Sequence, residues 1–548
     1  MKLIECVPNF SEGRDRGVID AIAAEISATP GAMLLDVDAG AATNRTVVTF
    51  IGGPEAVEEA AFRAIRKAAT LIDMSRHRGE HPRLGATDVC PFVPVSGATM
   101  EDCVAIAGRL GRRVGDELGI PVYLYEAAAT RTERRSLADI RKGEYESLAE
   151  KLKDPAWAPD FGPARFHREA GATVIGAREF LIAYNVNLNT RDKKLANVIA
   201  QAIREAGKTK RAADGTTTTV PGRFKECRAV GWYIEEFGRA QVSINLTNYN
   251  VTPLHDVFDA CCEEASKLGL RVTGSELVGL IPKAALLAAG DHFLAKQGKT
   301  AGIPERERVH TAVLSLGLSE LAPFEPAHKV IEYRYAGPPA GLAAMTLRDF
   351  ADELSSSSPA PGGGSVAALC GALSASLVAM VAALTWAKTG LEAARPTMKA
   401  AGTDAQSLKD WFLDAVDRDT DAFNSVLAAM RMPKKTADEI ARRAAAVECA
   451  NQGAAKVPLD VLEATIRALE LALRVVKDGN KNSVSDAGVA GAAALAAAEG
   501  AALNVRINVP SLSDRSVAAE FLARQAGALS RARELAGQVL AAVDDVLG

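Results

Sequence analysis

The segment Lys2-Leu3-Ile4-Glu5-Cys6-Val7-Pro8-Asn9-Phe10-Ser11-Glu12-Gly13 opens the chain with an apolar run that passes, at a proline, into a polar loop. The run predicts a β-strand over Lys2 to Val7. After the loop, apolar residues recur at positions 18, 19, 22 and 26, a spacing that puts them on one face of a helix. The chain therefore begins with strand, loop and helix, the order from which α/β folds are built.

The first third continues this alternation, and the middle third repeats it. In the first third we expect strands at Met33 to Asp38, Arg45 to Ile51, Asp88 to Val95 and Val122 to Glu126, and an amphipathic helix at Glu55 to Met74. In the middle third we expect strands at Glu179 to Asn187 and Arg271 to Leu277, helices at Lys193 to Glu205 and Pro253 to Leu268, and a hairpin of Arg223 to Tyr233 with Ala240 to Leu246. Both thirds follow the β-α-β-β-α-β order of the split βαβ pattern. Two such layers side by side leave a cleft, and ligands commonly bind at such junctions.

The last third differs in composition. The stretch Tyr335 to Gly341 is rich in glycine and proline and predicts a linker, and beyond Met345 the chain is rich in alanine and predicted to be helical. Val366 to Ala387 carries no charge and is long enough to span a bilayer, but its many small residues favour a buried, closely packed helix. The predicted fold is multidomain, with α/β subdomains at 1–178 and 179–332, a linker at 333–345 and an all-α helical bundle at 346–548.

Bulk properties narrow the function classes. The 548 residues carry a net charge of −4, so no overall basic field indicates nucleic-acid binding. The eight cysteines are scattered, without a CxxC pair or metal-ligand spacing. We therefore expect reduced thiols and a cytoplasmic enzyme. The N-terminus lacks the apolar core of a signal peptide.

The loop Arg76-His77-Arg78-Gly79-Glu80-His81-Pro82-Arg83-Leu84-Gly85 is the strongest candidate for chemistry, because the chain has only seven histidines and two of them lie here. His81 would serve as a general base that titrates near neutral pH, with Asp38 as a possible orienting carboxylate. A metal site of His77 and His81 is disfavoured, because the HExxH order is absent and the loop would not keep both on one face. The remaining interpretation is a solvated loop whose charges pair locally.

Other polar groups gather where predicted strands end, a usual place for active-site residues. Asn9 and Arg14 follow the first strand, and Asp36 and Asp38 share one face of another. Asn44 and Arg45 follow shortly after. The Gly/Pro/aromatic loop from Pro159 to Gly171 joins the two α/β units and suits a flat ring, although an ordinary inter-domain linker would look similar.

The helical part contains three further polar segments. Ser355 to Ser365 precedes the uncharged helix and would present backbone amides to an anion. Asp417, Asp419 and Asp421 lie in one helical stretch, where a buried carboxylate would have a raised pKa and a solvated helix face is the alternative. Ser485 and Asp486 cap another alanine-rich helix.

These motifs resemble a known family. Glu5 to Gly13, Asp36 to Gly40 and Arg78 to Arg83 resemble glutamate formimidoyltransferase, whereas Pro359 to Ser365, Asp417 to Phe423 and Asn482 to Ala487 resemble formimidoyltetrahydrofolate cyclodeaminase. Their order resembles that of the bifunctional formimidoyltransferase-cyclodeaminases of histidine breakdown, over essentially the whole chain. The resemblance implies that a formimino group passes from N-formimino-L-glutamate to N5 of tetrahydrofolate. The product is then cyclised to 5,10-methenyltetrahydrofolate with release of ammonia.

The resemblance also implies site residues. His81 would be the transferase base and Asp419 the cyclodeaminase acid, with Asp417 its nearest competitor, and Asp38 would stabilise the cationic amidine. Substrate contacts are expected at Asn9, Asn44, Arg45 and Arg83, and cyclodeaminase loop contacts at Gly362, Gly363, Gly364, Ser365 and Asp486. The implied folate segment is Gly162, Pro163, Ala164, Arg165, Phe166, His167, Arg168, Glu169, Ala170 and Gly171. Lys208 to Val220 is expected to form an atypically long loop.

The implied ligands are small molecules. Tetrahydrofolate would be a co-substrate, in polyglutamylated form, with Arg76, Arg78 and Arg83 holding its acidic tail, and no metal, nucleic acid or membrane is expected. The family implies a homo-oligomer, in the form of a ring-shaped octamer. Three alternatives remain open: a formyl donor, a chain with one active half, and a non-catalytic folate-binding scaffold.

Overall fold

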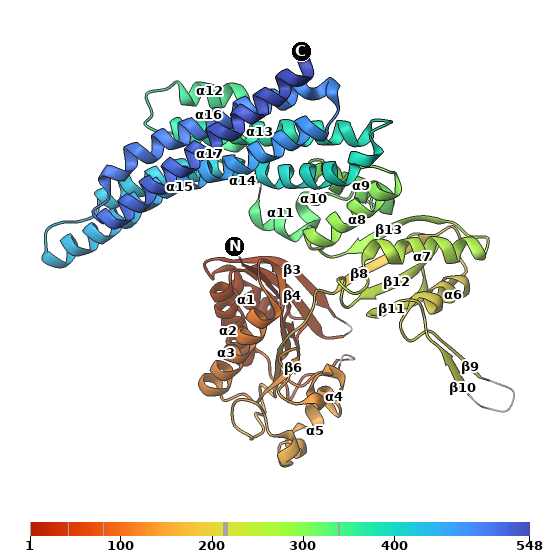
Figure 1. The fold of residues 1–548 in the computed structure, drawn as a ribbon. Helices are drawn as coiled ribbons and strands as arrows, with labels where there is room; N and C mark the ends of the chain where they lie inside the picture. Colours follow the sequence, from red (N-terminus) through yellow and green to blue (C-terminus); the bar gives the residue numbers. More distant parts are fainter. Residues whose placement is uncertain (1, 42, 80–81, 212–216, 338–339) are drawn as a thin grey trace. The chain divides into compact units, whose positions relative to one another are not determined.

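The computed structural model describes the chain except for residues 1, 42, 80–81, 212–216 and 338–339 (Figure 1). The chain forms two compact units, and each is described by itself. One unit comprises residues 1–285 and 317–336, and the other comprises residues 286–316 and 337–548. The first is built mainly on β-sheets and the second on helices.

A seven-stranded sheet organises the first part of the α/β unit. Its strands follow the order β1-β4-β2-β5-β7-β6, with β3 paired to β4. The pairings among β1 to β5 are antiparallel, whereas β5, β7 and β6 run parallel. The strands are β1 (Leu3–Cys6), β2 (Asn9–Phe10), β3 (Ala32–Gly40), β4 (Arg45–Gly52), β5 (Thr87–Ser96), β6 (Val122–Glu126) and β7 (Thr173–Ala177).

Three helices cover one face of this sheet: α1 (Arg16–Ser27), α2 (Pro54–Leu71) and α3 (Met100–Leu118) (Figure 1). Ile4, Cys6, Phe50 and Phe92 point from the strands into the core beneath these helices. Because side chains alternate along a strand, their neighbours point to the opposite face. Near β5, β6 and β7 that opposite face is covered by α4 (Leu137–Arg141) and α5 (Glu144–Lys151).

The register shows that β1 and β2 are two parts of one run along β4. Glu5 pairs with Ile51 and Asn9 with Val47, so the pairing continues in step across Pro8. On the other side of β4, Asp36 pairs with Thr49 and Asp38 with Val47. Polar residues from β1, β2 and β3 are therefore set in rows on the face that α1 to α3 leave uncovered.

The second sheet repeats the predicted order with one insertion. Strands β8 (Ile182–Leu188), β11 (Cys227–Ile234), β12 (Arg239–Leu246) and β13 (Val272–Val278) lie in the order β11-β12-β8-β13. Helices α6 (Lys193–Ile203) and α7 (Leu254–Lys267) come between them in the chain, and α10 (Pro326–Lys329) and α11 (Ile331–Ala336) follow.

The expectation of a long loop at Lys208 to Val220 is wrong. This segment forms a hairpin of β9 (Lys208–Arg211) and β10 (Thr217–Val220), a two-stranded sheet of its own. The four consecutive threonines explain the difference, because β-branched residues favour strands and three of them lie in β10.

The second unit is helical. Its elements are the end of α8 (Lys283–Lys296), α9 (Glu305–Leu316), α12 (Leu347–Leu354), α13 (Gly363–Ala387), α14 (Arg395–Met430), α15 (Ala437–Asp478), α16 (Val484–Asn508) and α17 (Arg515–Leu547). The segment between α8 and α9 contacts the bundle, since Trp386 Nε1 donates a 2.9 Å hydrogen bond to the Gly298 carbonyl. The domain limits expected at residues 178, 332 and 345 remain predictions.

Small residues determine how closely the central helices approach one another. A Cβ atom at Gly371 of α13 would lie 2.5 Å from the Phe412 ring of α14, so only glycine permits this approach. By length and apolarity, α13 and the 481–511 segment that contains α16 would suffice to cross a membrane. In this bundle 56% and 50% of their most apolar windows are buried. Their apolar character is therefore used in part for packing against other helices.

Candidate functional site

A cavity of ≈ 620 Å³ lies in the α/β unit, between the open face of the first sheet and segments of the second part of the unit. Ligand pockets for small molecules and cofactors span about 300–1,000 Å³. The cavity therefore has room for a substrate the size of a cofactor. Its lining residues are Glu5, Val7, Asp36, Val47, Thr49, Arg178, Phe180, Leu181, Ala183, Val278, Gly279, Leu280, His328, Lys329 and Arg334.

The floor of the cavity follows from strand alternation. Glu5, Asp36, Val47 and Thr49 come from β1, β3 and β4 and share the face opposite α1 to α3. Val47 is the register partner of Asp38 on one side and of Asn9 on the other. Because paired side chains on one face lie about 5 Å apart, both predicted site residues border the floor.

The opposite side of the cavity carries positive groups. Arg178 lies between β7 and β8, and Lys329 and Arg334 lie on α10 and α11. Arg334 donates a 2.7 Å hydrogen bond to the Leu35 carbonyl, which ties α11 to β3. The cavity thus has acids on its floor and cations on its wall, an arrangement suited to a ligand with both donor groups and carboxylates.

Glu5 is the most perturbed acid of the cavity. Its side chain comes from the middle of β1, and the residue is only 4% exposed. Burial raises the pKa of Glu5 from 4.5 to about 7, although the nearby charge of Arg178 acts in the opposite direction. A carboxyl group of this kind is close to half ionised at neutral pH. The sequence prediction overlooked it, because a single acid in an apolar strand resembles a surface residue.

The predicted base lies outside the described residues, since Glu80 and His81 are among those whose structure is not described. The other histidine of the loop, His77, is buried. Its Nδ1 accepts from Arg83 Nε at 3.3 Å, so its Nε2 carries the proton that is donated to the Asn44 carbonyl at 2.9 Å. Burial lowers the pKa of His77, which favours this neutral form. His77 therefore anchors the loop.

Two predicted substrate-binding residues also hold this loop. Arg83 forms ion pairs of 2.7 Å with Glu144 and with Glu146 of α5. Asn44, at a positive φ of 48°, accepts from the Gly13 amide at 3.0 Å and donates to the Arg78 carbonyl at 2.9 Å. Contact with a substrate would require these side chains to exchange present partners. Sequence reasoning missed Glu144 and Glu146 because they lie more than 60 positions away.

Buried charged side chains connect the contacts that hold this loop to Arg45, another predicted substrate-binding residue. Asp88 is 1% exposed, accepts from the Leu84 amide at 2.9 Å and forms an ion pair with Arg141 of α4. The pKa of Arg45 is lowered by burial and by Arg141, whereas Asp88 and Asp38 act to raise it. Arg45 thus lies within electrostatic reach of both acids, and the network joins the cavity border to the loop.

The predicted folate segment runs beside the same loop. Gly85 and Gly171 form an isolated bridge, and the Ala86 amide donates to the Ala170 carbonyl at 2.9 Å. Gly171 has a φ of +70°, and a Cβ there would lie 2.2 Å from the Leu84 carbonyl oxygen, so glycine is required. Within the segment, the Phe166 ring lies 5.3 Å from the Tyr145 ring of α5. The structure therefore brings together the two predicted transferase segments.

A second polar site lies in the helical unit, at the start of α13. Asp419 of α14 accepts a 3.1 Å hydrogen bond from Ser365 Oγ. Burial raises the pKa of Asp419, and its hydrogen bonds from Ser365 partly oppose this. A Cβ atom at Gly364 would lie 2.0 Å from Asp419 Oδ1, so glycine makes room for the carboxylate. Asn504 of α16 approaches the same helix end, with Nδ2 3.2 Å from where a Gly363 Cβ would lie.

The competing aspartate has another function. Asp417 accepts from the Leu342 amide at 2.6 Å and from the Ala343 amide at 3.4 Å, and so holds the short 3₁₀ turn Leu342–Ala344.

Asp486, predicted to belong to the cyclodeaminase loop, lies in the first turn of α16, 18 residues before Asn504. At a helical rise of about 1.5 Å per residue, Asp486 is about 27 Å along α16 from Asn504, which is the residue of α16 near Asp419. Within one chain, therefore, Asp486 does not reach Asp419.

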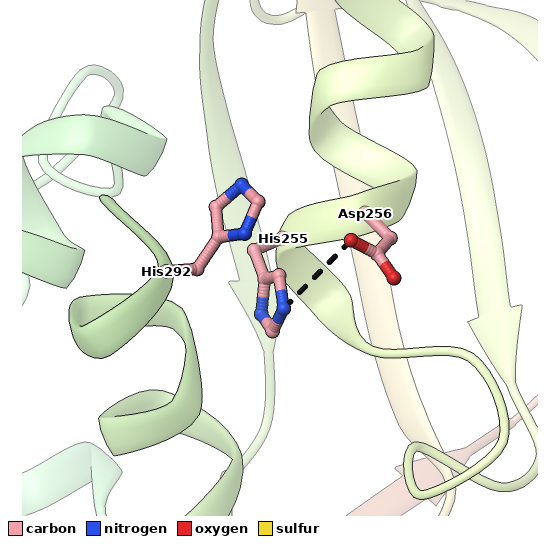
Figure 2. A group of neighbouring side chains, drawn as sticks. All are labelled: His255, Asp256 and His292. Carbon is pink, nitrogen blue, oxygen red and sulfur yellow. Dashed lines mark ion pairs between the residues drawn. The ribbon is translucent and has the colours of Figure 1, made fainter. Parts of the chain in front are cut away.

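Among the described residues, neither unit by itself holds three neighbouring side chains that could bind a metal ion. Figure 2 shows His255 and Asp256 at the start of α7, where His255 Nε2 lies 3.8 Å from Asp256 Oδ1. His292, which Figure 2 also labels, belongs to the helical unit. The pair within the α/β unit provides two ligands, fewer than the three or four protein ligands of the usual zinc sites.

Comparison with known proteins gives matches along most of the chain. Family models match residues 3–178 (formiminotransferase domain, N-terminal subdomain), 183–336 (formiminotransferase domain) and 346–526 (formiminotransferase-cyclodeaminase). A formimidoyltransferase-cyclodeaminase from Sus scrofa is 46% identical over 543 residues, 98% of each chain. A glutamate formimidoyltransferase from Streptococcus pyogenes serotype M1 is 43% identical over 54% of this chain and 93% of its own. A methenyltetrahydrofolate cyclohydrolase from Methylorubrum extorquens is 38% identical over 35% of this chain and 91% of its own.

Proposed function

The chain belongs to the formiminotransferase-cyclodeaminase family, and from this membership we propose which residues carry its two activities. It is a bifunctional enzyme. One activity transfers the formimino group from N-formimino-L-glutamate to N5 of tetrahydrofolate, and the other closes the product to 5,10-methenyltetrahydrofolate with release of ammonia. We assign the transfer to the α/β unit and the cyclisation to the helical unit.

In the transfer, N5 of tetrahydrofolate attacks the formimino carbon. The new N5–C bond forms, the bond from that carbon to the glutamate nitrogen breaks, and the glutamate nitrogen takes up a proton. We propose His81 as the base that removes the N5 proton, an effect typically worth about 10²–10⁴-fold. Asp38 would stabilise the cationic amidine, and its place beside Val47 of the cavity floor supports this role.

The cavity is the observation that carries the assignment of the transfer. It lies beside Asp38 and Asn9, and the network of Arg45, Asp88 and Arg141 connects this border to the loop that contains His81. We propose that the pterin occupies the cavity and that the segment from Gly162 to Gly171 binds folate next to it. Arg76 and Arg78, which follow α2 and are exposed to solvent, would bind the carboxylates of a polyglutamylated tail.

In the cyclisation, N10 attacks the formimino carbon and loses its proton, and the bond from that carbon to the terminal nitrogen breaks. Ammonia leaves well only after that nitrogen has been protonated, and we propose Asp419 as the donor. Its raised pKa and its hydrogen bond from Ser365 support this choice over Asp417, which caps a turn. The glycines at 362–364 would leave space for the substrate in front of α13, whereas Asp486, at the other end of α16 from Asn504, would act elsewhere.

Two single substitutions test the assignment. In His81→Asn, glutamate release from N-formiminoglutamate should fall by about 10²-fold or more, while added 5-formimidoyltetrahydrofolate is still cyclised. In Asp419→Asn, glutamate release should persist and formation of methenyltetrahydrofolate, followed by its absorbance, should fall by a similar factor. Equal loss of both activities in either variant would contradict the division. Full activity with a formyl donor alone, or no loss in either variant, would favour the alternative functions.

We also propose a cytoplasmic homo-oligomer, with an octamer as the family-based expectation. Each of the eight cysteines is a free thiol, and Cys6 and Cys90 lie 3.5 Å apart without a disulfide, which fits a reducing compartment. Exposed apolar side chains recur along α13 and α16, among them Leu373, Leu503 and Ile507. A surface of this kind favours association of copies. Sedimentation analysis measures the subunit number, and a monomer at micromolar concentration would contradict the proposal.

A further inference from the structure

Glu5 is a buried acid that the mechanism above does not use. It lies on the cavity floor, is 4% exposed and is influenced by the charge of Arg178. Among the described residues, its carboxylate accepts no hydrogen bond and forms no ion pair within 4.0 Å. Buried carboxylates are usually paired or hydrogen-bonded, so its two oxygens are available to something that enters the cavity.

A carboxylate in this position is suited to a ligand that presents two neighbouring N–H donors on one edge. Its two oxygens accept two parallel N–H bonds in one plane. The 2-amino-4-oxopyrimidine ring of a reduced pterin presents two such donors side by side, at N3 and at the 2-amino group. We propose that Glu5 binds this edge of tetrahydrofolate with a pair of hydrogen bonds, and is thereby the residue that orients the pterin and selects it. The proposal rests on the assignment of the transfer to this cavity.

The sheet register supports the orientation. Glu5 and Asn9 share the floor side of one run and are four residues apart, about 13 Å at the usual strand rise of about 3.3 Å. A two-ring heterocycle with a hydrogen bond at each end spans a gap of this order. With its pyrimidine edge at Glu5, the ring extends along β1 and β2. Its N5 side then points to the border where Asp38 and Asn9 lie.

The neighbouring charges favour the pterin over the other donor-rich group of the reaction, the formamidine of N-formiminoglutamate. That group is cationic, and Arg178 beside Glu5 would offset the attraction that the Glu5 carboxylate exerts on it. The pyrimidine edge is neutral and is not repelled. The other charged groups around the cavity are Asp36 of β3 and, on the opposite wall, His328, Lys329 and Arg334. These cations would instead attract the carboxylates of either substrate.

A pterin analogue tests the hydrogen bonds directly. The full-length enzyme is assayed by glutamate release, which reports the transfer step alone, with tetrahydrofolate or with its 2-desamino analogue. For the wild type, KM should be about 10- to 100-fold higher for the analogue, because a buried acceptor is left unpaired. Glu5→Gln should raise the KM for tetrahydrofolate by a similar factor and should no longer distinguish the two compounds.

Asp36→Asn is the matched control, because Asp36 is another acid of the same floor. It should keep the wild-type ratio between the two compounds. Where Glu5→Gln is too unstable to assay, Glu5→Asp retracts the carboxylate by one methylene group and should reduce the same ratio. The preference of the wild type for tetrahydrofolate should also weaken as pH falls from 8 to 6, since Glu5 is then protonated, and should not change in Glu5→Gln.

The outcomes separate this inference from the function on which it rests. A wild type that releases no glutamate in the presence of tetrahydrofolate would overturn the assigned transfer itself. An active wild type whose Glu5→Gln variant still discriminates against the 2-desamino compound would overturn the role of Glu5 and leave the transfer intact. If Asp36→Asn lost the discrimination between the two compounds to the same extent, the role of Glu5 would also be contradicted. The discrimination would then depend on the negative charge of the cavity floor and not on Glu5 itself.

Discussion

At the scale of single residues, strand alternation decides which polar groups share the cavity. Glu5, Asp36 and Asp38 each follow or precede apolar residues that point to the helices, so these acids necessarily point to the open face. The sequence predicted that Asp36 and Asp38 share a face. It did not predict the burial of Glu5, because burial depends on segments more than 170 residues away, such as Arg178 and Arg334. Long-range contacts of this kind leave no local pattern.

The burial of Glu5 predicts a pH dependence of stability. The pKa of Glu5 is about 7 in the folded chain and close to 4.5 when unfolded. At pH values between these two pKa values, the Glu5 carboxyl keeps its proton in the folded state and releases it in the unfolded state. Stability therefore falls as pH rises from about 4.5 to 7, by at most about 3 kcal/mol from this group. Glu5→Gln, which cannot ionise, should melt above the wild type at pH 8, with a smaller difference at pH 5. A difference that grows towards acidic pH would contradict the pKa assignment.

The glycine beside Asp419 predicts a loss of activity without a loss of folding. A Cβ at Gly364 overlaps the end of the Asp419 side chain, which can rotate away, so Gly364→Ala should move the carboxylate and leave the backbone in place. Cyclisation of added 5-formimidoyltetrahydrofolate should fall by about 10-fold or more, by analogy with the size of acid–base effects. Glutamate release should be retained.

Gly537→Ala in α17 is the control, because a Cβ there meets nothing within 4 Å. It should leave both activities in place. Unchanged cyclisation in Gly364→Ala would argue against Asp419 as the acid.

At the scale of elements, the order of strands and helices was largely predictable, because apolar periodicity reports it directly. The β-hairpin of β9 and β10 was not, since a polar threonine run carries no alternation to mark a strand. The anchoring of the loop from Arg76 to Gly85 was not predictable either. Its ties run through Arg83 to α5 and through Asp88 to α4, both of which come from later in the chain.

The approach of α13 and α14 predicts a strong packing effect. In Gly371→Ala the new methyl group would lie 2.5 Å from the Phe412 ring, which is fully buried. Overpacking of this kind typically reduces stability by about 1–3 kcal/mol, more than the gain of about 1 kcal/mol from helix propensity. Thermal unfolding of the helical unit should therefore shift to lower temperature. Gly453→Ala in α15, where nothing lies within 4 Å, should shift it upward. An upward shift for both variants would contradict the packing.

At the scale of the whole molecule, the two sites lie in separate compact units. The sequence predicted this division from the change to an alanine-rich composition after Met345, because composition alone separates an α/β part from a helical part. It did not predict that residues 286–316 group with the helices. The segment between α8 and α9 contacts the bundle, through the hydrogen bond from Trp386 to the Gly298 carbonyl and through the close approach of Gly302 to Gly402.

The central claim is that each unit completes one reaction with its own residues. It is tested most directly by mixing the His81→Asn and Asp419→Asn enzymes with N-formiminoglutamate and tetrahydrofolate and recording the absorbance of methenyltetrahydrofolate. Each variant alone should form the product at no more than about a hundredth of the wild-type rate. The mixture should recover it after a lag, as the intermediate passes through solution from one variant to the other. A single variant that forms the product at the wild-type rate would contradict the assignment of the two sites. If the mixture does not recover the rate, although Asp419→Asn alone releases glutamate and His81→Asn alone cyclises added intermediate, a free intermediate is excluded.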